Sequence, residues 1–265
     1  MFFRLSSWEL AFLVFGAVFG ATGVGMALGY HVRHRSEHLR APLGVLQSAL
    51  LGLVGLVLAF GLALAVGRYE SRRAAVVDEA NAIGTTYLRA EMLAEPMRTQ
   101  SLQRLVRYTD ATIRFSHSVP NSSDARLAVA DGQKLQRQLW GLAGQALADA
   151  PVASAPRLYV ETLNEMIDMQ TTRVAALNNR VPGPVLAVEV IFAAVALGLL
   201  ALYLAILGRS VLPVLLAAGL ICLLLFVTFD LDRPTRGLIR IPATPLTSLR
   251  ASMELPPAAG APSRP

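Results

Sequence analysis

The sequence predicts an all-α, polytopic membrane protein with four transmembrane helices in two pairs and a cytosolic helical bundle inserted between the pairs. Four apolar runs each reach the roughly 20 residues that a helix needs to cross ~30 Å of hydrocarbon. They lie as two pairs on either side of a polar segment, and none alternates polar with apolar residues as a barrel strand would. The runs cover residues 10–30, 43–66, 184–207 and 211–229.

These runs divide the chain into four parts. We expect transmembrane helices 1 and 2 in residues 1–66, the helical bundle in 67–182, transmembrane helices 3 and 4 in 183–230, and a C-terminal tail in 231–265. The tail becomes rich in Pro, Gly and Ala after about residue 250, and we expect it to be disordered from there. The first run is too long for the apolar core of a signal peptide, so we expect it to stay in the mature protein.

The polar segment shows apolar residues at a spacing near 3.6, which is typical of amphipathic helices. Breaks at Pro96, at 118–123, at 151–156 and at 178–184 predict four helices, with Ser123 as the N-cap of the third. Only Gly67 separates the second apolar run from the first amphipathic helix. We therefore predict one continuous helix through this glycine.

Composition excludes several classes of function. Apolar residues make up 54% of the chain, a value that a soluble domain of this size would reach only with large exposed apolar patches. The single cysteine excludes an intrachain disulfide. The 24 basic residues are interleaved with acids, which argues against a nucleic-acid partner. No phosphate loop, nucleophile elbow or zinc-protease motif occurs, so we expect no catalytic residues, no cofactor and no enzyme. His31, His34 and His38 have the spacing of a metal site on a helix, but arginines lie between them, and a solvated loop is the preferred interpretation.

The arginines near the membrane boundaries predict the orientation, because basic residues accumulate on the cytoplasmic side. Nine boundary arginines against four place both termini and the bundle on the cytoplasmic side of a bacterial inner membrane. The nine are Arg4, Arg68, Arg72, Arg73, Arg173, Arg180, Arg233, Arg236 and Arg240; the four are Arg33, Arg35, Arg40 and Arg209.

The second apolar run contains a candidate pore. Leu56, Phe60 and Leu64 recur every four residues and are followed on nearly the same line by Arg68 and Arg72. Repeated around a symmetry axis, such apolar residues would form a neck that gates ions by dewetting, and the arginines would form its inner mouth. The alternative is that these side chains contact lipid or other helices, as most apolar membrane residues do.

Three stretches resemble the signature segments of the bestrophin-like family of bacterial membrane proteins, and more distantly the bestrophin ion channels. They are residues 77–89 (VDEANAIGTTYLR), 163–168 (LNEMID) with Thr172 and Arg173, and 231–240 (LDRPTRGLIR). The resemblance implies a pentameric channel whose neck is lined by the second membrane helix, as the pattern of Leu56, Phe60 and Leu64 also suggests. The chain departs from bestrophins in having Arg73-Ala74 where they carry paired aromatics, and only Asp230 and Asp232 where they carry an acidic calcium clasp.

The leading hypothesis is therefore a homo-oligomeric ion channel or pore. Its partners would be the lipid bilayer, further copies of the same chain and inorganic ions. The alternative from another class is a non-conducting, membrane-anchored helical module that senses or recruits a partner. Oligomeric state and an axial passage for ions distinguish the two.

Overall fold

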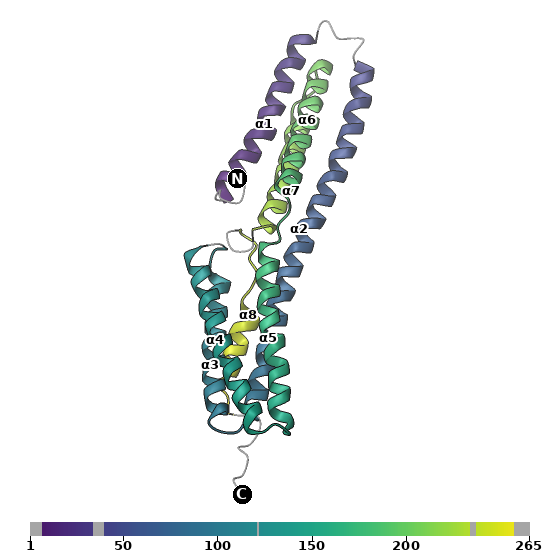
Figure 1. The fold of residues 1–265 in the computed structure, drawn as a ribbon. Coiled ribbons are helices and arrows are strands. Elements are labelled where there is room, and N and C mark those ends of the chain that lie inside the picture. Colours follow the sequence, from purple (N-terminus) through teal and green to yellow (C-terminus); the bar gives the residue numbers. More distant parts are fainter. Residues whose placement is uncertain (1–6, 34–39, 121, 234–236, 257–265) are drawn as a thin grey trace. The chain divides into compact units, whose positions relative to one another are not determined.

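The computed structural model describes residues 7–33, 40–120, 122–233 and 237–256. Within these residues the chain is helical, as predicted, and Figure 1 shows the helices in chain order. They are α1 (Ser7–Val32), α2 (Arg40–Ala90), α3 (Met97–His117), α4 (Ser123–Asp149), α5 (Ser154–Asn178), α6 (Gly183–Leu207), α7 (Leu212–Leu231) and α8 (Thr244–Ser252). Four stretches of the described chain are long and apolar enough to cross a membrane, and they contain the first three predicted runs and all of the fourth except Val211.

The chain separates into two compact units. The first, here called the membrane unit, contains the residues up to Tyr69 and those from Arg180 to Arg240. The second, here called the bundle unit, contains Glu70–Asn179 and the chain from Ile241 onward. Each unit has its own apolar core.

In the membrane unit α1 packs closely against α6, because glycines bring the two backbones together. A Cβ on Gly25 would overlap the carbonyl oxygen of Gly198, and one on Gly29 would lie 2.6 Å from the side chain of Ala205. Gly16 and Gly20 share the same four-residue spacing, yet a Cβ on either would meet nothing within 4 Å. Of these two glycine pairs in α1, only Gly25 and Gly29 lie at a close helix contact within the described chain.

Helix α2 confirms the prediction of continuity. It runs for 51 residues from Arg40 to Ala90 without interruption at Gly67. Its only proline, Pro42, lies in the first turn, where the missing N–H would have no partner within the helix. The helix contains residues of both units.

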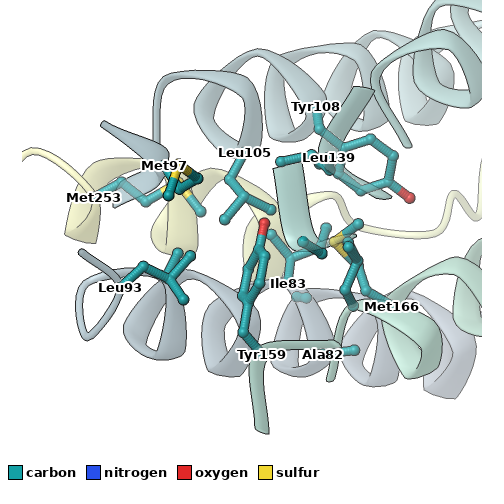
Figure 2. Packing of buried hydrophobic residues seen from close by; sticks show 14 of the residues in the cluster. Ala82, Ile83, Leu93, Met97, Leu105, Tyr108, Leu139, Tyr159, Met166 and Met253 are labelled. Atoms are coloured by element: carbon teal, nitrogen blue, oxygen red, sulfur yellow. The ribbon is translucent and has the colours of Figure 1, made fainter. Parts of the chain in front are cut away.

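The core of the bundle unit is built from α2, α3, α4, α5 and α8. Figure 2 shows Ile83 of α2, Leu105 of α3, Leu139 of α4 and Met166 of α5 packed together, all fully buried. The N-cap of α4 is Ser122, not Ser123 as predicted, because the Ser122 side chain accepts a hydrogen bond from the Ala125 N–H at 3.1 Å.

The C-terminal segment differs from the sequence expectation. It forms α8, whose Leu246 is fully buried, and Met253 just beyond it is 7% exposed within the bundle core. The expectation of disorder from about residue 250 therefore does not hold for the next few residues. The part of the tail from 257 onward lies outside the described residues.

Candidate functional site

The predicted neck residues form one exposed stripe on α2. Leu56, Phe60 and Leu64 are 54%, 62% and 46% exposed in the single chain. Apolar residues on the opposite face of the same stretch, Val54, Leu58 and Ala65, are at most 3% exposed. Because a helix turns about 100° per residue, α2 buries one face within the membrane unit and leaves the stripe on the opposite face about half exposed.

The two arginines predicted at the inner mouth have different environments. Arg68 is partly exposed, whereas Arg72 is 1% exposed and belongs to the bundle unit. The Arg72 guanidinium donates hydrogen bonds to the carbonyl oxygens of Ala176 at 3.3 Å and Asn179 at 2.8 Å. These carbonyls end α5, where a cation also interacts favourably with the helix dipole.

The two aspartates after the last membrane helix are bonded to backbone. Asp230 accepts hydrogen bonds from the N–H groups of Leu238 at 2.9 Å and Ile239 at 2.8 Å. Asp232, which is fully buried, accepts from the Val181 N–H at 3.2 Å. Both carboxylates hold the chain at the ends of the membrane helices, which is a structural role.

No group of three potential metal ligands is found in the part of the chain that the structure describes. His31 lies in the last turn of α1. His34 and His38 fall outside the described residues, so the histidine pattern has no structural counterpart here.

Comparison with known proteins identifies the family. The Bestrophin-like domain family matches residues 14–246, which is most of the chain. The chain belongs to the Bestrophin-like family.

Solved structures agree with this assignment at the level of the fold. Three crystal structures of variants of a bacterial bestrophin homologue from Klebsiella pneumoniae match with TM-scores of 0.64, 0.67 and 0.68 at 12%, 14% and 12% identity. They cover 89%, 91% and 89% of this chain and 97%, 97% and 96% of the respective structures. No curated protein matches the chain.

Two of the signature segments of this bestrophin-like protein meet in a buried ion pair in the bundle unit. Arg173 of α5 donates a hydrogen bond to Glu79 of α2, and the two side chains are 2% and 1% exposed. The Arg173 guanidinium also lies 5.2 Å from the centre of the Phe115 ring. Burial raises the pKa of the Glu79 carboxyl above its usual value, while the charge and hydrogen bond of Arg173 oppose that rise.

A short chain of polar side chains extends this pair. The Tyr108 hydroxyl lies 3.5 Å from the Glu79 carboxylate, and the Gln136 amide donates to Tyr108 at 3.3 Å and to the Gln170 carbonyl at 2.7 Å. Burial first, and then the neighbouring Glu79 charge, raise the pKa of Tyr108 well above its usual value. The network joins four helices of the bundle. Sequence reasoning missed it, although Glu79 and Arg173 both lie in the signature segments.

A second buried carboxylate that sequence reasoning missed lies in the membrane unit. Glu189 is the seventh residue of α6, near the helix end. Its side chain is 1% exposed and packs against Gly61 of α2. The pattern of apolar residues around Glu189 gave no sign of this contact, which depends on a glycine in another helix.

Proposed function

We propose that this protein is a homo-oligomeric ion channel whose neck is lined by α2. The observation that carries the proposal is the stripe of Leu56, Phe60 and Leu64, which is exposed while the opposite face of the same helix is buried. Membership of the Bestrophin-like family supports the proposal, since the solved structures with this fold include those described as bacterial bestrophin homologues. The pentamer implied by the family resemblance would bring five copies of the stripe around one axis.

The chemistry of the stripe suits a gate. Leucine and phenylalanine side chains offer no group that can replace the water shell of an ion, so a narrow ring of them resists wetting. Widening the ring, or moving the helices apart, admits water and ions. The barrier would therefore depend on the size of the side chain at Phe60.

Charge at the inner end of the neck is assigned to Arg68. It lies one helical turn beyond Leu64 and is partly exposed. A ring of such arginines would raise the local concentration of anions. Arg72, which the sequence places on the same line, is engaged with the end of α5, and we assign it a structural role.

We propose further that the bundle unit and both termini are cytoplasmic in a bacterial inner membrane. The support is the nine-to-four distribution of boundary arginines. A reporter that works only in the cytoplasm, inserted at Asn121, should be active. Activity of a periplasmic reporter at that position instead would reverse the orientation.

The channel proposal is tested by Phe60→Ala, with Phe12→Ala as the matched control. Phe12 is an equally apolar α1 residue, 75% exposed, and outside the proposed neck. In liposomes of purified protein, Phe60→Ala should raise ion flux because the ring becomes wider and wets, and Phe12→Ala should leave flux unchanged.

Two results would count against the proposal. If Phe60→Ala assembles normally and its ion flux equals that of a conducting parent, Phe60 does not line the neck. The absence of flux in all three proteins would favour a membrane-anchored module that does not conduct.

A further inference from the structure

Among the residues that the structure describes, Glu189 is a buried carboxyl group without a polar partner. Its side chain is 1% exposed, and neither carboxylate oxygen has a hydrogen-bond partner among the described residues. An ionised carboxylate in such a place loses its hydration without any compensation, which costs several kcal/mol or more. Ionisable residues in membrane segments are rare and commonly functional for this reason.

The carboxyl group occupies space that α2 leaves open. A Cβ added to Gly61 would overlap Oε1 of Glu189 and lie 2.5 Å from its Cδ and 3.0 Å from its Oε2. The neighbouring glycines Gly52, Gly55 and Gly67 on α2 would meet nothing within 4 Å. Gly61 is thus the glycine of α2 that the Glu189 contact requires.

The contact lies behind the proposed neck. Gly61 is buried and follows Phe60 directly in α2, and Leu64 lies three residues further on. A change in the way that α6 supports α2 at Gly61 would therefore move the backbone that carries two of the three stripe residues.

The helices around Glu189 supply no countercharge at its level. Cys222, which is buried in α7, is the only titratable side chain in the neighbouring membrane segments. These segments are residues 10–29 of α1, 43–67 of α2 and 212–229 of α7. Tyr203 lies near the far end of α6 itself. The charged groups near the helix ends on the side where α6 begins are Glu9, Arg68, Arg180, Asp230, Asp232 and Arg233, and both aspartates are bonded to backbone N–H groups.

We propose that Glu189 is a proton-binding site, and that the bound proton keeps α2 packed against α6 at Gly61. A proton neutralises the group without further ligands, whereas a hard metal cation takes about six or more oxygen ligands. Loss of the proton leaves a charge that must acquire water or a new partner. The α2 contact then loosens, and the neck changes its resistance to ions.

The proton site is tested by infrared spectroscopy of the purified full chain as the pH is raised. A protonated carboxylic acid shows a carbonyl stretch that a carboxylate lacks. We expect this band at neutral pH in the parent, its loss in Glu189→Gln, and its retention in Glu70→Gln, which changes an exposed carboxylate of the same size. The proposal would be overturned if the infrared spectra of the parent and Glu189→Gln did not differ at any pH. It would also be overturned if the parent lacked the carbonyl band and its spectrum changed on addition of sodium instead.

The coupling to the neck rests on the proposed channel function and is tested by ion flux against pH. The parent flux should change over the pH range in which the band disappears, and Glu189→Gln should lack that change. A conducting Glu189→Gln protein with the full pH response would overturn the coupling. A parent that shows the band but no flux would contradict the channel function and leave the proton site standing.

A helix-packing measurement keeps the test valid if Glu189→Gln folds poorly. Gly61→Ala should lower the melting temperature because its methyl group meets the carboxyl group, and Gly55→Ala should not. Adding Glu189→Ala to Gly61→Ala should recover part of the loss, since the two sites are in contact and their effects should not add. Strict additivity would contradict the contact on which the proposal depends.

Discussion

Glu79 and Arg173 illustrate how much depends on single residues in the bundle unit. Both side chains are almost completely removed from water, and each is the other's charged partner. A buried pair of this kind adds little net stability, but removing one partner is costly because the other charge stays behind. The pair joins two segments that lie 94 residues apart in the chain.

We predict that Arg173→Met lowers the free energy of unfolding by about 3–5 kcal/mol near neutral pH. The substitution removes the interaction that opposes the rise in the Glu79 pKa, so this pKa increases further in the folded state. A group whose folded pKa exceeds its unfolded value contributes stability that is complete below the unfolded pKa and is lost as the pH rises through the folded pKa. The variant should therefore be closest to the parent in acid and should weaken as the pH increases.

Denaturant unfolding of the full chain in detergent at several pH values measures this effect. Arg114→Met is the matched control, because the Arg114–Asp131 pair is 3.2 Å apart but both side chains are more than half exposed. Such a surface pair contributes about 0–1 kcal/mol. Equal losses in the two variants, or a loss in Arg173→Met that does not depend on pH, would contradict the assigned role.

At the scale of single residues, the sequence predicted the apolar stripe but could not distinguish the environments of the two arginines that follow it. Arg68 and Arg72 are four residues apart and appear equivalent on a helical projection. Only the position of the α5 terminus, whose carbonyls bind Arg72, distinguishes them. The same holds for Glu189, because the space that it fills is made by Gly61 in a different helix.

Among the elements, α2 has the most direct consequence for function. It is continuous from the membrane unit into the bundle unit, so a displacement in one part of the helix can reach the other without crossing a loop. Gly67 lies in this helix with open space around its Cβ position. Glycine there costs about 1 kcal/mol relative to alanine and leaves the helix easier to bend.

The long elements were predictable because their signals are local. Apolar runs of about 20 residues and breaks at proline-rich turns depend on neighbouring residues, and they predicted all four membrane helices and the helices of the bundle. The short α8 could not be predicted in this way. It has only nine residues with a proline at its start, and its order depends on burial of Leu246 in a core built by distant helices.

For the whole molecule, the central question is whether copies of α2 surround an ion path. The single chain leaves Leu56, Phe60 and Leu64 exposed, and lipid or another copy could cover them. A symmetry axis arises only when several copies assemble, so a local pattern in one chain does not predict the number of subunits.

The most direct measurement is the effect on ion flux of a charged thiol reagent attached at Phe60. Cys222 is the only cysteine and is fully buried, so Phe60→Cys in a Cys222→Ala background carries one reactive site, and Phe12→Cys in the same background is the control. We predict that labelling Phe60→Cys with a charged methanethiosulfonate changes the flux through liposomes, because the charge enters the dewetted ring. Labelling Phe12→Cys should have no effect. Complete labelling of Phe60→Cys in a conducting protein with no change in flux would contradict the account.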